Sequence, residues 1–282
     1  MGKFQKRRVG NAEIIALQDS WTYVQPGPYF PGVEEADWTD YRPFLEADGS
    51  LLLNMGAWLI HSAGQTILVD TGCGWRPAPN NRELAAARLP RVMEEAGVGT
   101  DDIDVVVFTH LHWDHTGWNT VKNGSLRPLF PRARHVMQRV EWEFWSEGGA
   151  EFREKVRFDD VLAPIESAGL IDLVENDYVV TPEVVALPTP GHTPGHVAFV
   201  VGSGNDKAYL IGDAAHFPVQ VNEPSWSPAA DVDPVRSATT RRALWDRIEA
   251  EGSIVASGHF PFPGMGRVET RGAQRVFVPI DG

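Results

Sequence analysis

Runs of apolar residues divide the chain into short strands and a few helices. Residues 6–9 and 14–17 are joined at Gly10-Asn11, a pair typical of a tight turn, and we expect them to form a β-hairpin. The run 104–108 (DVVVF) is apolar at consecutive positions, which is typical of a strand buried on both faces. This predicted strand leads the chain directly into Thr109-His110.

The rest of the pattern alternates between strands and helices, with no change of composition that would mark a linker. We therefore expect one domain over residues 1–282. Helices are predicted at 81–96, with an interruption near Pro90, at 141–158 as a broken helix, and at 234–251, opened by Asp233-Pro234. Further strands are predicted at 57–61, 66–70, 134–138, 183–187, 197–201, 207–211 and 254–256.

Segment 20–50 breaks this pattern. It contains four prolines and several aromatic residues and shows no sustained periodicity, which predicts a long loop. The aromatic residues argue against disorder, and ordered loops of this length are usually functional. We expect the segment to act as a lid or as a contact in a homodimer.

Composition limits the classes of function. A net charge of −13 with no cluster of Lys and Arg argues against nucleic-acid binding, because contacts to phosphate require clustered cations. No run of about 18 apolar residues is present, so we expect no membrane span. The N-terminus lacks the apolar stretch of a secretion signal, and the expected location is the cytoplasm. The single cysteine, Cys73, is expected to be a buried small residue, since no base is indicated beside it.

The chemistry is concentrated in residues 109–115, with the sequence THLHWDH. Four groups able to bind a metal within six residues would be a costly concentration of polar side chains if they only packed. In a turn that leaves a strand, His110 and His112 can share one ion, while Asp114 and His115 turn toward a second. Imidazole nitrogens and a carboxylate suit zinc or a similar ion better than calcium or magnesium, although iron, manganese and cobalt accept the same ligands.

Three further polar positions follow predicted strands. His192 lies in TPGHTPGH (189–196), Asp213 follows Gly212 at a strand end, and His259 follows the short apolar run 254–256. His196 repeats the Pro-Gly-His pattern, but we expect it to be a hydrogen-bonded structural residue beside the site. Asp70 ends another predicted strand and is our candidate for orienting one ligating histidine through its second ring nitrogen.

The ordered set HLHWDH, TPGHTPGH, GD and a late GH resembles the metallo-β-lactamase-fold superfamily of hydrolases over nearly the whole chain. The resemblance implies an α/β fold, a four-layer αββα sandwich, with two metal ions in a cleft at one edge of the sheets. It also implies that Asp213 bridges both ions. The remaining ligands implied are His110, His112 and His192 for the first ion, and Asp114, His115 and His259 for the second.

Within the superfamily, segments 213–220, 231–234, 240–242 and 259–264 resemble the branch that contains methyl parathion hydrolase and the acyl-homoserine lactonases. The chain departs from those lactonases at one position. They carry a tyrosine three residues after the bridging aspartate, where this chain has His216. We expect either Asp114 or His216 to pass the proton to the leaving group.

The predicted activity is hydrolysis by a binuclear metal centre. Two ions about 3.5–4 Å apart can share a bridging water, lower its pKa and direct the resulting hydroxide at an electrophile. We expect the substrate to be a small ester-like molecule, first a lactone, second a phosphotriester or an aryl ester. A β-lactamase, a metal-binding protein without turnover and a diiron redox protein are weaker alternatives. An aromatic pocket for an apolar substrate group is expected from Trp113, Trp118, Trp226 and Phe217.

Overall fold

Two seven-stranded β-sheets form the centre of the computed structural model, which describes residues 3–78 and 83–280. The first sheet has the order β1-β2-β3-β4-β5-β8-β9, and the second follows chain order from β10 to β16. The strands of the first sheet are β1 (Phe4–Val9), β2 (Ala12–Val24), β3 (Leu51–Ser62), β4 (Gln65–Val69), β5 (Val105–Val107), β8 (Arg134–Gln138) and β9 (Ile171–Val174). Those of the second are β10 (Val179–Thr181), β11 (Val184–Pro188), β12 (Val197–Ser203), β13 (Asp206–Leu210), β14 (Ile254–Ala256), β15 (Met265–Arg271) and β16 (Gln274–Pro279).

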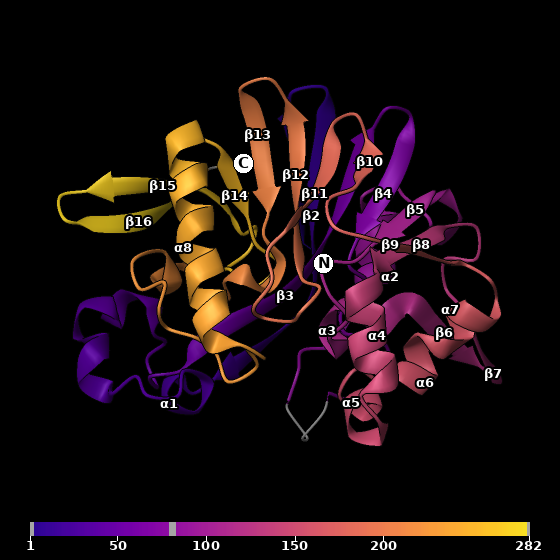
Figure 1. The fold of residues 1–282 in the computed structure, drawn as a ribbon, viewed down its shortest axis with the longest axis horizontal. Coiled ribbons are helices and arrows are strands. Elements are labelled where there is room, and N and C mark those ends of the chain that lie inside the picture. Colours follow the sequence, from indigo (N-terminus) through magenta and orange to yellow (C-terminus); the bar gives the residue numbers. More distant parts are fainter. Residues whose placement is uncertain (1–2, 79–82, 281–282) are drawn as a thin grey trace.

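Helices cover the outer face of each sheet (Figure 1). The long helix α8 (Pro234–Glu251) packs on the second sheet, and its N-terminus is capped by Asp233, which accepts a hydrogen bond from the Arg236 amide. The first sheet is covered by α2 (Leu89–Glu95), α4 (Arg139–Glu147), α5 (Ala150–Lys155), α6 (Phe158–Val161) and α7 (Ala163–Ser167). A two-stranded ribbon of β6 (Thr120–Asn123) and β7 (Ser125–Pro128) lies beside these helices.

Alternation along the strands explains the layers. On β2, Ile15 faces the helices while Ile14 faces the second sheet, and on β3 Leu59 and Ile60 divide in the same way. The apolar run of β5 is buried on both faces, as predicted, because Val106 packs under the helices and its neighbours pack between the sheets. The predicted four-layer αββα sandwich is confirmed.

Most predicted elements are present, but one predicted helix starts later than expected and several strands were not predicted. Of the predicted helix 81–96, residues 81–82 lie outside the described residues, and the helix begins only at Leu89. Pro90 therefore occupies its first turn, where a missing amide costs nothing, and does not interrupt it. The strands β6, β7, β9, β10, β15 and β16 were not predicted. The β15–β16 hairpin extends away from the body of the molecule (Figure 1).

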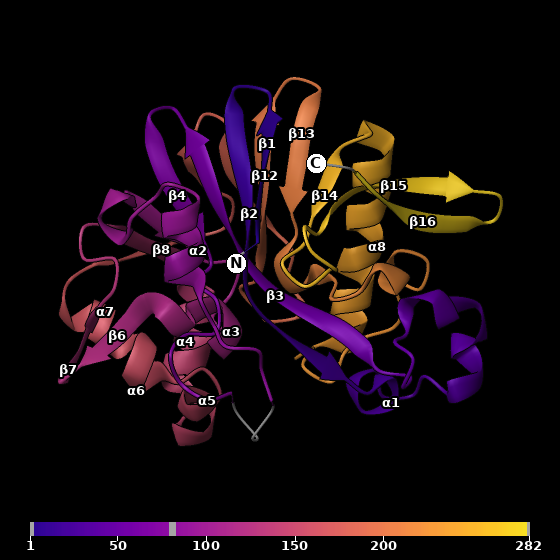
Figure 2. The same ribbon diagram turned by 180° about the vertical axis from the view of Figure 1, so that it is seen from behind.

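Segment 20–50 is more ordered than a long loop. Strand β2 continues to Val24, and α1 (Pro26–Tyr29) and the 3₁₀ helix η1 (Glu35–Phe44) follow. Figure 2 shows β3 running past the end of the sheet toward this segment. Phe30 and Trp38 are buried, and the Trp38 ring lies 4.9 Å from that of Trp226. The aromatic residues therefore pack against a distant part of the chain, which local periodicity cannot reveal; a lid or dimer role stays a prediction.

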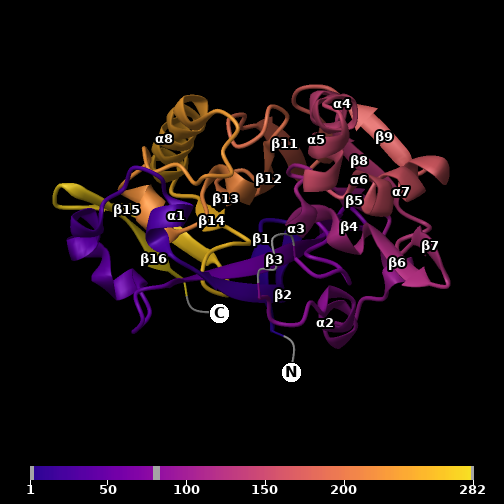
Figure 3. The ribbon, with the colours of Figure 1, turned by 90° about the horizontal axis from the view of Figure 1, so that it is seen from below.

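The ends of the strands determine where polar loops meet. Strands β4, β5 and β8 are parallel neighbours in one sheet, and β13 and β14 are parallel in the other. The carboxyl ends of parallel strands share an edge, where sites usually form. Asp70 follows β4, His110 follows β5, and Asp213 and His259 follow β13 and β14. Seen from below in Figure 3, the loops of both sheets face each other at this end.

No helix among residues 3–78 and 83–280 is long and apolar enough to cross a membrane. The cytoplasmic location expected from the sequence stays a prediction.

A buried carboxylate on β2 fixes the segment beside this edge. Asp19 is fully buried and accepts hydrogen bonds from the amides of Cys73, Arg88 and Leu89 at 2.7, 2.7 and 2.6 Å. The Trp118 indole donates a fourth bond at 3.1 Å. Asp19 thus joins β2 to Cys73, to the start of α2 and to Trp118, which follows segment 109–115 in the chain.

We predict that Asp19→Ala lowers the free energy of unfolding by about 3 kcal/mol or more, because four N–H groups, two of them fully buried, lose their acceptor. Urea denaturation followed by tryptophan fluorescence measures the change. Asp101→Ala, at an exposed position, is the control and should stay within about 0.5 kcal/mol of the native chain. Equal stability of the two variants would contradict an anchoring role for Asp19.

Candidate metal centre

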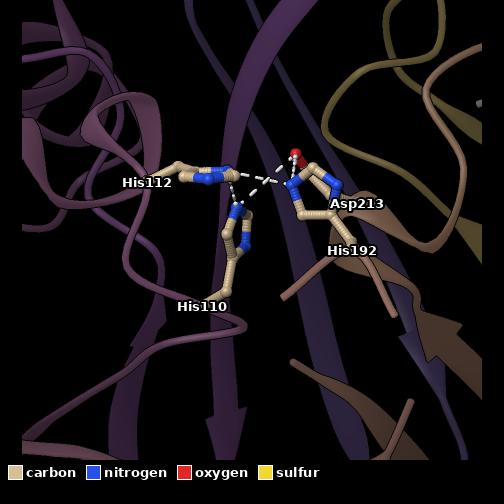
Figure 4. A group of neighbouring side chains, drawn as sticks. All are labelled: His110, His112, His192 and Asp213. Carbon is tan, nitrogen blue, oxygen red and sulfur yellow. Dashed lines mark hydrogen bonds and ion pairs between the residues drawn. The ribbon is translucent and has the colours of Figure 1, made fainter. Parts of the chain in front are cut away.

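Three imidazoles and one carboxylate converge at the edge of the sheets (Figure 4). His112 Nδ1 lies 2.9 Å from His110 Nε2 and 2.9 Å from His192 Nε2. One ring nitrogen offers either a proton or a lone pair, so it cannot form good hydrogen bonds in both directions. Asp213 Oδ2 completes the group, 3.2 Å from His192 Nε2 and 3.6 Å from His110 Nε2. This is the arrangement expected of ligands around one ion.

A second group lies on the other side of Asp213. Its Oδ1 atom is 3.1 Å from His115 Nε2 and 3.0 Å from His259 Nε2. Asp114 Oδ2 lies 3.9 and 3.8 Å from the same two nitrogens. His115 Nε2, His259 Nε2 and Asp213 Oδ1 are buried and have no hydrogen-bond partner among the described residues. Such orphaned atoms are rare unless an ion satisfies them, so the donor set fits a binuclear divalent centre.

The electrostatics follow from burial and charge. Burial alone would raise the pKa of Asp213, but His115 and His259 hold it well below its usual range. Burial, together with neighbouring imidazoles, lowers the pKa of His110 and His112 well below the ordinary value. These two rings are therefore neutral at pH 7, which is the form that binds metals.

The second nitrogen is also held at 2.8 Å in three of the five candidate ligand rings. His115 Nδ1 lies 2.8 Å from Asp70 Oδ2, His192 Nδ1 lies 2.8 Å from Asp231 Oδ1, and His259 Nδ1 lies 2.8 Å from the Asn54 carbonyl. Such bonds fix the ring orientation and tautomer and make the free nitrogen a better ligand. Asp70, the predicted candidate for orienting a ligating histidine, thus lies within hydrogen-bond distance of the His115 ring. Asp70 also accepts bonds from the Thr109 amide and hydroxyl, both at 2.8 Å.

Asp231 was not predicted as a site residue. Its second oxygen lies 3.3 Å from Arg241, a fully buried arginine of α8 that also donates to the carbonyls of Ala214 and Pro224. Burial raises the pKa of Asp231, but the His192 ring and Arg241 outweigh it and lower the pKa to about 2. The only signal in the sequence was that both residues fall within the family-like segments 231–234 and 240–242.

Glu141 was also missed. Its buried carboxylate accepts hydrogen bonds from the Leu111 amide at 3.2 Å, the Gly195 amide at 2.9 Å and the Trp145 indole at 2.6 Å. It therefore connects α4 to the loops that carry His112 and His192. Burial raises the pKa of this carboxyl. A lone glutamate in a predicted helix gives no sequence signal of such a role.

Two further histidines lie beside the site, and their environments differ. His196 Nδ1 lies 2.8 Å from the Thr189 hydroxyl and its Nε2 accepts from the Asp213 amide at 3.0 Å, so neither ring nitrogen is left for an ion. His216 Nε2 lies 3.0 Å from Asp213 Oδ2, while its Nδ1 is buried without a partner among the described residues. Its ring stacks on His259 with centroids 5.0 Å apart. Burial lowers the pKa of His216 to about 4, so the ring is neutral.

A cavity of about 840 Å³ opens onto these groups, including Asp114, Asp213 and His216. Of the four aromatic residues predicted to line a pocket, Trp113 does so. Trp118 instead donates to Asp19 under the helices, and Phe217 and Trp226 pack into the cluster around Phe30 and Trp38. Their side chains complete the core beneath segment 20–50 and do not form the lining, which also includes Tyr29 and Trp145.

We predict that Asp213→Ala abolishes activity and the binding of paired metals together, because both groups of ligands contain this carboxylate. Metal analysis after dialysis should find one equivalent or less per chain, against about two for the native chain. Asp159→Ala, at an exposed position, serves as the control. A fully active Asp213→Ala protein that retains two metals would show that Asp213 does not bridge.

Two N-acyl homoserine lactonases are similar to this chain in sequence. The N-acyl homoserine lactonase AiiA of Bacillus thuringiensis subsp. kurstaki is 28% identical over 225 residues, covering 74% of this chain and 82% of the relative. The lactonase AttM of Agrobacterium fabrum is 31% identical over 176 residues, covering 58% and 61%.

Solved structures share the fold. AidC, a dizinc quorum-quenching lactonase solved with a product, matches with a TM-score of 0.83 at 20% identity, over 100% of this chain and 98% of that one. The hydrolase AbOPH matches with a TM-score of 0.86 at 22% identity, over 100% and 99%. The model of the metallo-beta-lactamase superfamily matches residues 57–259, a span that contains all seven predicted ligands. The chain belongs to the metallo-beta-lactamase superfamily.

Proposed function

We propose that this chain is a lactonase with two zinc ions. The observation that carries the proposal is the set of three buried candidate ligand atoms without hydrogen-bond partners among the described residues. Two of the residues that contribute them, Asp213 and His259, line a cavity large enough for a small ester. One ion would be held by His110, His112 and His192, the other by Asp114, His115 and His259, and both by Asp213.

Family membership and similarity to lactonases confirm the predicted class, a metal-dependent hydrolase. The relatives AiiA and AttM are named N-acyl homoserine lactonases, which favours a lactone over a phosphotriester or an aryl ester. Zinc is favoured because imidazole and carboxylate suit it and because the structural neighbour AidC is described as a dizinc enzyme.

The residues around the cavity have separable tasks. When bound, two divalent ions supply an activated water and polarise the carbonyl that it attacks. With Nε2 of His216 donating to Asp213, the unpartnered Nδ1 carries a lone pair. His216 can therefore accept a proton during the attack and return it to the leaving alkoxide. Asp114, whose side chain is 13% exposed and lines the same cavity, is the alternative group for this transfer.

Segment 20–50 contributes Tyr29 to the lining of the cavity. The centroid of the Tyr29 ring lies 5.8 Å from that of the His216 ring. This position supports the lid role proposed for the segment. A lid excludes water from the reacting groups and strengthens their electrostatic interactions.

We predict chelator-sensitive hydrolysis that is fastest on a lactone. The panel comprises a long-chain acyl-homoserine lactone, an aliphatic δ-lactone, methyl paraoxon, an aryl acetate and a cephalosporin, tested on zinc-loaded protein. We expect a preference for a lactone of ~100-fold or more in kcat/KM, about 2.7 kcal/mol of transition-state stabilisation. A faster rate on methyl paraoxon or on the aryl acetate would replace the lactonase assignment. No turnover with two metals bound would place the substrate outside the panel.

We also predict that His216→Gln lowers kcat on the preferred lactone by about 100-fold while two metals stay bound, because a proton-transfer group is lost and no ligand is removed. Asp114→Asn is the comparison variant. Because Asp114 is a candidate metal ligand, this variant should show a lower metal content as well as a lower kcat. If His216→Gln releases one metal, the residue is a ligand and does not transfer the proton.

A further inference from the structure

An arginine lines the same cavity and is not explained by the metal centre. Arg157 is only 7% exposed, and its guanidinium lies 5.2 Å from the centre of the Trp113 ring. Nη2 donates to the Pro77 carbonyl, which is the only hydrogen bond of this side chain to the described residues. Trp113 lies between His112 and Asp114 in the chain, so the guanidinium is held against the ligand loop.

The charge of Arg157 has no matching anion. Two other cations of the cavity wall are paired, Arg76 with Asp160 and Lys155 with Glu151. No carboxylate of residues 3–78 and 83–280 lies within 4.0 Å of the Arg157 nitrogens, although a buried charge is costly unless it is paired. Burial, followed by the charge of Arg76, lowers the pKa of Arg157, while the charges of Asp114 and Glu154, which form no ion pair with it, act in the opposite direction.

Contacts of the side chain limit its freedom. The guanidinium donates to the Pro77 carbonyl and lies against the Trp113 ring, and the residue is largely buried. These contacts restrain the guanidinium before any ligand arrives. A fixed guanidinium loses little entropy when it binds and can bind a carboxylate through two parallel hydrogen bonds.

We propose that Arg157 is a specificity-determining residue that binds a carboxylate on the substrate, so the preferred substrates are lactones with an anionic group away from the reacting carbonyl. The inference rests on the proposed lactonase function and adds the substrate class. Hydrolysis itself is unchanged: water adds to the ring carbonyl, the ring C–O bond breaks and the alkoxide takes a proton.

The test compares two lactones of similar shape and different charge. N-succinyl-homoserine lactone carries a terminal carboxylate, and N-(4-methylpentanoyl)-homoserine lactone carries two methyl groups in its place. We expect the zinc-loaded native protein to favour the anionic lactone by about 10-fold or more in kcat/KM. Titration calorimetry with the two ring-opened products gives a second readout, in which the anionic product should bind about 10-fold more tightly.

Three variants assign the preference to one side chain. Arg157→Gln should reduce both ratios to about 2-fold or less, and Arg157→Lys, which keeps the charge without the planar fork, should give an intermediate value. Arg153→Gln is the matched control, since Arg153 pairs with Asp159 and does not line the cavity. It should keep the native ratios. Raising the salt concentration should weaken the preference in every protein that keeps a cation at position 157, and it should have little effect on Arg157→Gln.

The outcomes separate this inference from the proposed function. No preference in the native protein, or a preference that survives in Arg157→Gln, overturns the role of Arg157. An equal loss on both lactones overturns it too, because Arg157 would then act on the reaction common to both. If neither lactone is opened but the anionic product binds through Arg157, the anion site stands and the lactonase assignment fails.

Discussion

The carboxylate of Asp213 is the group on which the rest of the site depends. It is 2% exposed, and its two oxygens lie within 3.0–3.2 Å of imidazole nitrogens of His115, His259, His192 and His216. A buried anion needs positive charge close by. The imidazoles cannot all supply it, because adjacent protonated rings repel one another and burial opposes their charging. Two divalent ions meet the requirement, which links metal binding to the stability of this edge of the fold.

Neither sheet could build this centre alone. The loops after β4 and β5 belong to the first sheet and carry Asp70 and His110, while Asp213 and His259 follow strands of the second. The shared core between the sheets therefore sets the spacing of the ligands. Outside them, Asp231 and its partner Arg241 connect the His192 ring to α8, so the helix layer also contributes to ligand orientation.

Sequence patterns predicted what is local. The run 104–108 and the motif 109–115 are contiguous, so the sequence alone predicted both a buried strand and the polar loop that follows it. Contacts that depend on tertiary packing left no such signal: Glu141 and Asp231 are isolated acids until the fold brings them to the ligand loops. The prediction of a long loop at 20–50 was wrong for the same reason, because the aromatic residues of this segment pack against residues near Trp226, far away in the sequence. Trp118 and Phe217 were assigned to the pocket because proximity in sequence to a motif does not decide which way a side chain faces.

Recognition of an anionic substrate is compatible with the strongly acidic composition of the chain. Charges on the surface are screened over about 8 Å at physiological ionic strength, so the net charge of −13 acts on an approaching anion only close to the surface. Inside the cavity the local charges decide: Arg157, which has no ion-pair partner among the described residues, is cationic there, and two bound divalent ions would add positive charge. The acidic exterior would slow the arrival of an anion, whereas the interior would hold it. Affinity for such a substrate should therefore arise mainly from slow dissociation, because the contacts form only after the ligand is within the cavity.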